Sequence, residues 1–231
     1  MASSSGGRDS AKWAILVAAG SGARLGAERP KAFVALGDRV LLAESLERLD
    51  TSDWIDAVVV AVPADWEDAA IALAEEIVAS KVAAVVAGGA TRAESVRAAL
   101  AQVPDDALVV IVHDAARPLV DDDVIERVIL PLGEGYDGVV PGLPLADTVK
   151  RVEQGLVVET VDRSDLVTVQ TPQAFTATAL RSAYAGVDPL AATDCASLVE
   201  ARGGRIRVVD GDVRLLKITT EADLALVASW L

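Results

Sequence analysis

The sequence predicts a single α/β domain with a mostly parallel sheet. From residue 13 to residue 114, apolar runs of strand length alternate with amphipathic helical stretches, the pattern of consecutive βαβ units. Of the 231 residues, 52% are hydrophobic and only 3% are aromatic. A core of Ala, Val, Leu and Ile suits buried parallel strands covered by helices. One compact domain over 12–231 is therefore expected, after a flexible polar tail over 1–11.

The elements follow from the spacing of the apolar residues. Strands are expected at 13–19, 57–62, 82–87, 108–112 (ending at His113 and Asp114) and 206–209. Helices are expected at 41–49, 65–79, 91–102, 177–185, 194–202 and from Glu221 onward.

A different pattern follows Pro141. Over 143–169, small apolar and polar residues alternate, with Gly155 at a turn position, which predicts a β-hairpin arm. The pattern leaves open whether this arm extends the sheet or contacts a second copy of the chain.

Charge and residue counts exclude several classes of protein. The net charge of −14 argues against a nucleic-acid surface, which needs an excess of Lys and Arg. With Cys195 and His113 as the one cysteine and the one histidine, neither a disulfide nor a Cys/His zinc site can form within one chain. His113 is interpreted as a structural residue at a strand end. The apolar runs are too short to span a membrane and the start lacks an apolar targeting core, so a cytoplasmic protein is expected.

A glycine-rich loop follows the first predicted strand. It contains Gly20, Gly22 and Gly26, together with Arg24 and Lys31. The glycine spacing is one residue too long for a dinucleotide fingerprint, and no Lys-Ser/Thr pair ends the loop as in a Walker A motif. A loop that holds a nucleoside triphosphate explains both the glycines and the cations. A glycine-rich connection without a ligand is the remaining alternative from the loop alone.

Two further polar sets follow predicted parallel strands. A glycine pair at 88–89 comes after the third strand, with Arg92 and Ser95 at the start of the next helix. Asp114 and Arg117 come after the fourth strand, where ligands bind in open α/β sheets. Asp114 suits Mg²⁺ or a ribose hydroxyl and Arg117 suits a phosphate, although a helix N-cap beside a surface arginine is the alternative interpretation.

Taken together, the motifs resemble the 2-C-methyl-D-erythritol 4-phosphate cytidylyltransferase family over nearly the whole chain. The motifs are Ala18-Ala19-Gly20-Ser21-Gly22, Pro30-Lys31, His113-Asp114-Ala115-Ala116-Arg117-Pro118, Thr171-Pro172-Gln173 and Lys217-Ile218-Thr219. The resemblance implies a Rossmann-like, three-layer nucleotidyltransferase fold with a β-hairpin arm. It implies transfer of CMP from CTP to 2-C-methyl-D-erythritol 4-phosphate with release of pyrophosphate, with Mg²⁺ or another divalent cation. It also implies a homodimer joined through the arm.

The same resemblance implies a role for each site residue. The implied catalytic residues are Arg24 and Lys31 on the triphosphate, and Arg163 and Lys217 on the acceptor phosphate. The implied nucleotide-binding residues are Ala18, Ala19, Gly20, Gly22, Gly89, Ala90, Ser95, Asp114 and Ala115. The implied acceptor-binding residues are Arg117, Thr148, Arg163, Thr171 and Thr193. Asp114 is the implied metal ligand, and Arg163 is expected to act across the dimer.

Three positions depart from the family pattern. Ala32 stands where Gln is usual, and Ala90 and Cys195 stand where acidic residues are usual. None of these changes removes a charged residue assigned to the chemistry. Two alternatives remain from the sequence: a ribitol 5-phosphate cytidylyltransferase, and a nucleotide-binding module without catalysis.

Overall fold

The computed structural model describes residues 11–20, 22, 29–185 and 193–231. The predicted tail over 1–11 therefore lies outside the described residues except for Ala11. The strands are β1 Lys12–Val17, β2 Ala35–Leu36, β3 Arg39–Val40, β4 Ala57–Val62, β5 Val82–Ala87, β6 Val109–Asp114, β7 Gly138–Pro144, β8 Val149–Glu153, β9 Leu156–Val161, β10 Val167–Val169, β11 Gln173–Thr176 and β12 Ile206–Asp210. The α-helices are α1 Leu41–Thr51, α2 Glu67–Glu76, α3 Arg92–Leu100, α4 Asp122–Ile129, α5 Ala177–Tyr184, α6 Cys195–Glu200 and α7 Glu221–Ala228.

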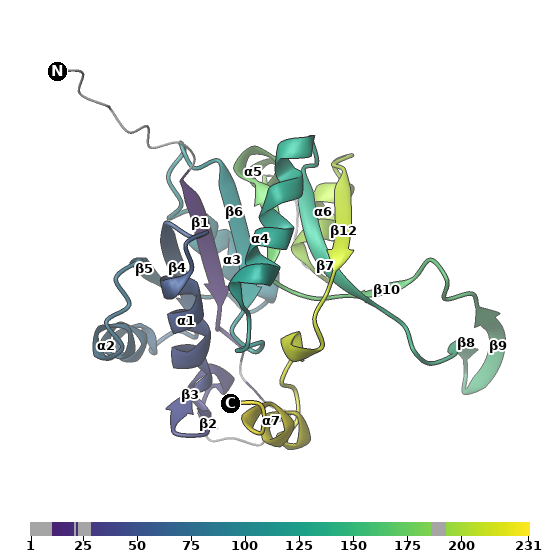
Figure 1. Cartoon of the computed structure of the whole chain (residues 1–231), viewed down its shortest axis with the longest axis horizontal. Helices are drawn as coiled ribbons and strands as arrows, with labels where there is room; N and C mark the ends of the chain where they lie inside the picture. Colours follow the sequence, from purple (N-terminus) through teal and green to yellow (C-terminus); the bar gives the residue numbers. More distant parts are fainter. Residues whose placement is uncertain (1–10, 21, 23–28, 186–192) are drawn as a thin grey trace.

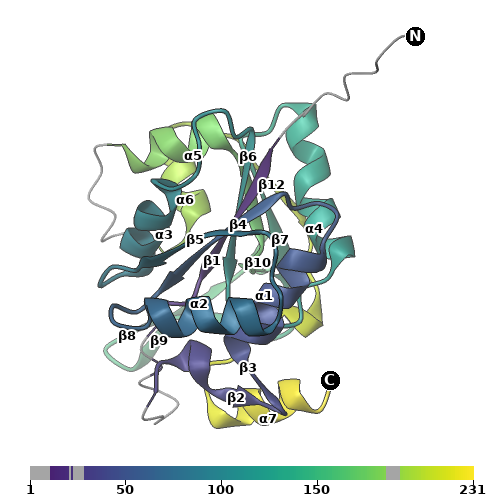
Figure 2. The ribbon, with the colours of Figure 1, turned by 90° about the vertical axis from the view of Figure 1, so that its left-hand side faces the viewer.

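An eight-stranded sheet forms the middle layer of the molecule (Figures 1 and 2). Its order is β10-β7-β11-β6-β1-β4-β5, with β12 paired to β7. Strands β6, β1, β4 and β5 run parallel, as do β7 and β12, whereas β11 is antiparallel to both of its neighbours. The prediction of a mostly parallel sheet is confirmed.

Helices cover both faces of this sheet, which gives three layers. The alternation of side chains along β1 shows the division: Ala14 and Leu16 pack with α1, α2 and α4, whereas Ile15 packs with α3, α5 and α6. A separate small cluster packs α7 against the β2–β3 hairpin below the sheet. None of the described helices is long and apolar enough to cross a membrane.

Helix α4 and strands β7 and β11 are absent from the elements expected from the sequence. Strand β7 contains Gly138, Pro141 and Gly142, residues that weaken a strand prediction. In the structure Gly138 lies between β11 and β12, opposite Phe175 and Ile206. A Cβ at Gly138 would lie 2.5 Å from Phe175 Cδ1, so the glycine permits close packing there. Tertiary contacts therefore override the local propensity.

The predicted arm is present but is shorter than predicted. Strands β8 and β9 pair as a two-stranded sheet of their own that projects from the body (Figure 1). Gln154 and Gly155 have φ values of 49° and 83°, the positive pair that a tight hairpin turn requires. The two ends of the predicted range, 143–144 and 167–169, belong to the main sheet, where β10 pairs with β7. Alternation along the chain could not locate this boundary, because strands of the sheet and strands of the arm share a period of two.

Replacement of Gly138 tests the tight packing of β7. We expect Gly138→Ala to lower the free energy of unfolding by about 1–3 kcal/mol, because the new methyl group overpacks the space beside Phe175 and Ile206. Denaturant unfolding measures the loss. Gly133→Ala is the matched control, since a Cβ there meets nothing within 4 Å. Equal stability of the two variants would contradict the packing argument.

Candidate functional site

Two adjoining cavities lie where the parallel strands β1, β5 and β6 end. The larger cavity has a volume of about 500 Å³. It is lined by eight of the predicted site residues: Ala19, Gly20, Lys31, Gly89, Ala90, Ser95, Asp114 and Lys217. The smaller cavity has a volume of about 210 Å³. It is lined by the predicted residues Asp114, Arg117, Thr171, Thr193 and Lys217. Arg92, Asp114 and Lys217 line both cavities and form their shared wall.

The glycine-rich loop brings backbone and lysine together at the larger cavity. The backbone N–H of Ala18 donates to the carbonyl of Ala61 (2.7 Å), which fixes the point where the chain leaves β1. Ala18 and Ala115, both predicted to bind the nucleotide, are buried and line neither cavity. Gly22 has a φ of +70°, and a Cβ there would lie 2.8 Å from Lys31 Cβ. Glycine is therefore required for this approach to Lys31. Arg24 lies outside the described residues.

The second glycine-rich turn forms the opposite wall. A Cβ on Gly88 would lie 2.4 Å from Ala19 Cβ, so glycine lets this turn and the first loop approach each other closely. Ser95 Oγ accepts from the backbone N–H of Gly89 (3.1 Å) and donates to the carbonyl of Thr91 (2.9 Å). Thr91 also forms a capping box with Glu94 at the start of α3. These bonds hold the first residue of the helix, Arg92, at the cavity.

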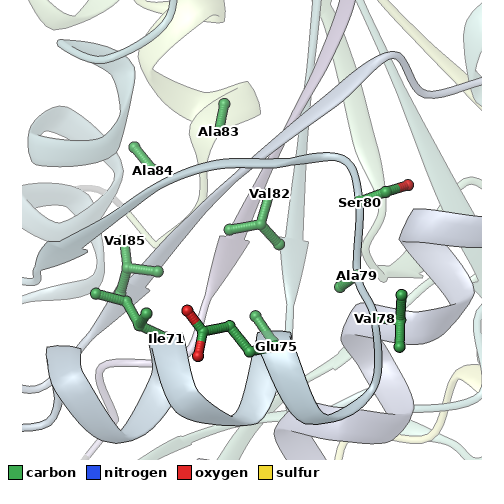
Figure 3. Close-up of a pocket in the computed structure, with 10 residues that line it drawn as sticks. Ile71, Glu75, Val78, Ala79, Ser80, Val82, Ala83, Ala84 and Val85 are labelled. Atoms are coloured by element: carbon green, nitrogen blue, oxygen red, sulfur yellow. The ribbon is translucent and has the colours of Figure 1, made fainter.

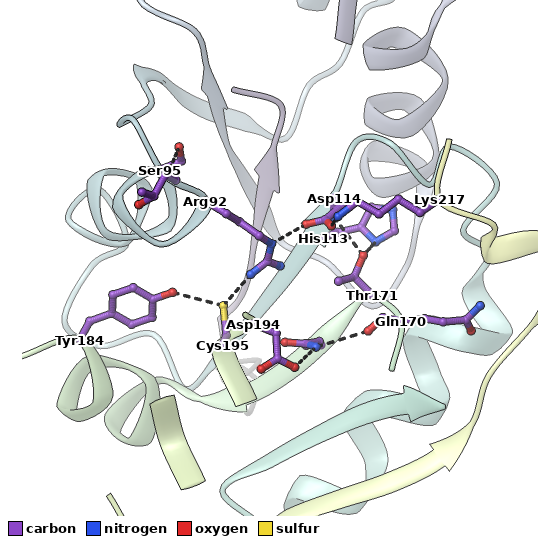
Figure 4. A network of polar contacts seen from close by, with 12 residues as sticks. Arg92, Ser95, His113, Asp114, Gln170, Thr171, Tyr184, Asp194, Cys195 and Lys217 are labelled. Carbon is purple, nitrogen blue, oxygen red and sulfur yellow. Dashed lines mark hydrogen bonds and ion pairs between the residues drawn. The ribbon is translucent and has the colours of Figure 1, made fainter. Parts of the chain in front are cut away.

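An ion cluster joins the two cavities (Figure 4). Arg92 Nε donates to Asp114 Oδ1 (2.8 Å), and Lys217 Nζ donates to Asp114 Oδ2 (2.6 Å). Burial alone would raise the pKa of Asp114, but the charges of Arg92 and Lys217 outweigh it and hold that pKa far below its usual range. Asp114 is therefore ionised, and the cluster of three residues carries a net positive charge.

His113 holds the residues next to the cluster. The backbone N–H of Asp114 donates to Thr171 Oγ1 (3.1 Å), and Thr171 Oγ1 lies 3.2 Å from His113 Nδ1. His113 Nε2 lies 3.0 Å from the carbonyl oxygen of Arg117. A carbonyl can only accept, so Nε2 carries the proton and Nδ1 accepts from the threonine hydroxyl. Burial lowers the pKa of His113 to about 4, so the ring is neutral at pH 7. The prediction of a structural histidine agrees with these contacts.

The smaller cavity combines cations with hydroxyl and amide groups. Arg117 Nη1 donates to the carbonyl of Leu215, a bond that ties the loop after β6 to the C-terminal segment. The next bond along this segment, from the N–H of Ile218 to the carbonyl of Ala116 (2.8 Å), places Lys217 beside Asp114. Arg92, Arg117 and Lys217 thus bring three cations to the smaller cavity, which is large enough for a phosphate group. Such a site suits a phosphate monoester.

Two predicted residues lie on the arm, outside the linings of both cavities. Thr148 and Arg163 lie at the base of the arm, where both are exposed and line neither cavity. Arg163 Nη1 donates to the backbone carbonyl of Ala146. The resemblance assigns both residues to the acceptor, so within one described chain the site lacks them.

Arg92 is a functional candidate to which the sequence alone assigned no specific role. It lines both cavities and contacts Asp114, yet no local motif marks its importance. The one signal in the sequence is its position, immediately after a glycine pair and a threonine N-cap at the end of a parallel strand.

A third cavity, of about 510 Å³, lies between α2 and the edge strand β5 (Figure 3). Among the residues that the structure describes, its walls are mainly apolar, including Ile71, Val82 and Val85, and Glu75 is the one charged side chain. It therefore lacks the convergent polar groups that an anionic substrate needs.

The single histidine predicts a pH dependence of stability. The pKa of His113 falls from 6.5 in an unfolded chain to about 4 in the fold. Between these values the unfolded chain binds a proton that the folded chain does not bind, so acidification favours unfolding. We expect the free energy of unfolding to drop by about 2 kcal/mol from pH 7 to pH 5.

Urea unfolding at both pH values measures this drop. In His113→Gln the drop should disappear, because no other histidine titrates in this window. The variant should also be less stable than the wild type at pH 7, since it loses the contact to Thr171. A drop of the same size in both proteins would show that His113 is not its source.

Comparisons with known proteins show the family of the chain. The family model described as "IspD: 2-C-methyl-D-erythritol 4-phosphate cytidylyltransferase" matches residues 13–231. The chain is 48% identical over 214 residues to a protein of that name from Rhodococcus jostii, covering 92% of both chains. It is 46% identical over 219 residues to one from Nocardia farcinica, covering 94% of this chain and 93% of the relative. The crystal structure of 2-C-methyl-D-erythritol 4-phosphate cytidylyltransferase from Thermus thermophilus has a TM-score of 0.74 and 31% identity, and the match covers 94% of this chain and 96% of that one. The chain belongs to the 2-C-methyl-D-erythritol 4-phosphate cytidylyltransferase family.

Proposed function

We propose that this protein transfers CMP from CTP to 2-C-methyl-D-erythritol 4-phosphate. The observation that carries the proposal is the shared wall of Arg92, Asp114 and Lys217 between a nucleotide-sized cavity and a smaller, cation-lined cavity. A transfer between two phosphates needs both substrates side by side, with their charges compensated where they meet. The products are the CDP-linked alcohol and pyrophosphate.

The chemistry needs no general base. The second pKa of a phosphate monoester lies near ~6, so much of the acceptor is a dianion at neutral pH. One of its oxygens attacks the α-phosphorus of CTP, a new P–O bond forms, and pyrophosphate leaves with the electrons of the bond it loses. The barrier is mainly repulsion between two polyanions and poor alignment. A neutral, buried His113 is compatible with this mechanism because no proton has to be removed from the acceptor.

The larger cavity suits the nucleotide. Its glycine-rich walls let a flat base and a ribose lie against backbone, with Ser95 holding the turn at Gly89. Lys31 enters from the opposite wall, where it would face the triphosphate and stabilise the charge that develops there. Asp114, ionised and fixed, would accept a hydrogen bond from a ribose hydroxyl.

Mg²⁺ is part of the proposal, and one carboxylate of the larger cavity suits it. The described residues contain no cluster of three His, Cys, Asp or Glu side chains that could enclose a metal. Mg²⁺ at nucleotide sites is commonly held by one or two carboxylates together with substrate phosphates, and Asp114 could supply one such ligand. Both Asp114 oxygens already contact cations, so the phosphates would supply most of the coordination. When bound, the ion would neutralise triphosphate charge.

The arm supports a homodimer in the proposed function. Val152, Leu156, Val157 and Val158 are exposed apolar side chains on the hairpin of a single chain. Arg163 and Thr148 lie at the base of the same arm, away from their own chain's cavities. We therefore expect a second copy to cover these apolar side chains and to receive Arg163 in its smaller cavity.

An assay of pyrophosphate release with Mg²⁺ tests the proposed function. CTP, UTP, ATP and GTP are each paired with methylerythritol phosphate, with ribitol 5-phosphate and with no acceptor. We expect release only with CTP and methylerythritol phosphate. Release with ribitol 5-phosphate alone would move the reaction to the other acceptor. Binding of CTP without release under any pairing would leave a binding module.

Subunit complementation tests the role of Arg163 across the dimer. Arg163→Ala alone should impair the step that uses the acceptor and leave CTP binding largely intact. Lys31→Ala alone should lower turnover, because it removes the cation that would face the triphosphate. If Arg163 acts in trans, a mixed dimer of the two variants contains one intact site. Co-expression should then restore about a quarter of wild-type turnover per site, for random pairing in a symmetric dimer. Turnover no higher than in the separate variants would place Arg163 in its own chain's site.

A further inference from the structure

The guanidinium of Arg92 has an unusual set of partners. Nε donates to Asp114, and Nη1 donates to Cys195 Sγ over 3.4 Å (Figure 4). Nη2 is buried and has no hydrogen-bond partner among the residues that the structure describes. A buried N–H of a charged group without an acceptor is unfavourable, and such groups usually indicate a missing partner.

Neither neighbour of Arg92 neutralises it fully. Burial raises the pKa of the Cys195 thiol, so it is an uncharged and weak acceptor. Tyr184, which lies 3.3 Å from Cys195 Sγ through its hydroxyl, also stays neutral because burial raises its pKa. Asp114 is shared with Lys217. The positive charge of Arg92 is therefore compensated only in part.

The position of Arg92 indicates which ligand can supply its missing hydrogen-bond partner. Arg92 lines both cavities, and in the proposed function the acceptor phosphate and the α-phosphate of the nucleotide meet between them. On the acceptor side it joins Arg117 and Lys217, and the planar fork of a guanidinium matches a phosphate dianion. On the nucleotide side, Lys31 already supplies a cation.

We propose that Arg92 is a further catalytic residue, which contacts the attacking phosphate of the acceptor. This inference rests on the proposed function and specifies its chemistry. A small turn of the guanidinium, with Nε still on Asp114, would bring an Nη group to a phosphate oxygen. Arg92 then holds this dianion against the α-phosphorus while the new P–O bond forms and the bond to pyrophosphate breaks. It offsets the repulsion between the two phosphates at the point where it is greatest.

Steady-state kinetics of Arg92→Gln provides the first test. We expect kcat/KM for methylerythritol phosphate to fall ~10²-fold, the size of effect typical of one preorganised donor. The dissociation constant of CTP, measured by calorimetry, should stay close to that of the wild type. Arg92→Lys keeps the charge without the fork and should recover part of the loss. Arg97→Gln, an exposed arginine on the same helix, is the matched control and should behave as wild type.

A double-variant cycle with Asp114→Asn separates direct contact from an effect through Asp114. If Arg92 contacts the acceptor, the loss caused by Arg92→Gln persists in the Asp114→Asn background. Disappearance of that loss would overturn the inference, since Arg92 would then act only by holding Asp114. The inference would also be overturned if Arg92→Gln had the turnover of the wild type, or if its affinity for CTP fell as much as its kcat/KM for the acceptor. Absence of pyrophosphate release by the wild type would refute the proposed function itself, together with the inference that rests on it.

Discussion

The site depends on one buried carboxylate held between two cations. Asp114 ends the central strand β6, and its two oxygens accept from Arg92, 22 residues earlier, and Lys217, 103 residues later. This arrangement joins the end of a strand, the start of α3 and the segment before α7 at one point. A buried carboxylate that lost both partners would be left uncompensated, which is strongly destabilising. The same contacts that hold the chain together therefore fix the cations in the position where phosphates are expected to bind. A protein with a net charge of −14 thus gains a local positive site.

The backbone around this cluster prepares the space for the ligands. Glycine at positions 22, 88 and 89 permits contacts that any side chain would block, and these close approaches shape the larger cavity. The capping box at Thr91 fixes the first turn of α3, so Arg92 starts from a rigid support. On the other side, Asp223 completes the capping box of α7 with the N-cap Thr220. Its side chain also accepts from the N–H and hydroxyl of Thr219, which holds the segment that carries Lys217. The positions of the cations therefore depend on helix ends and tight turns more than on the core.

The sequence predicted those parts of the fold that depend on local periodicity. The βαβ units up to Asp114 and the hairpin turn at Gly155 could be predicted because the apolar spacing and the turn residues agree with the final structure. Strand β7 could not, since Pro141 and its glycines contradict the strand that its neighbours impose. The prediction of the site had the same limit, because it depended on residues that are close together in the sequence. Motifs contiguous in sequence, such as the glycine-rich loop, were recognised, whereas the importance of Arg92 arises from partners distant along the chain. The predicted roles of the site residues all stay predictions. Arg24 lies outside the described residues, and Thr148 and Arg163 lie on the arm.

The departures from the family pattern have unequal consequences for the site. Ala32 is buried in the core beside Phe33, so its small side chain contributes packing without facing a ligand. Ala90 lines the larger cavity and, in the proposed function, would leave contacts with the base to the backbone. Cys195 has the greatest consequence, because a neutral thiol stands beside the guanidinium of Arg92 where the family pattern implies a carboxylate. In the described part of the chain, Asp114 is then the sole ionic partner of Arg92. The thiol therefore leaves more positive charge at the shared wall of the two cavities, and this charge favours a dianionic acceptor in the smaller one.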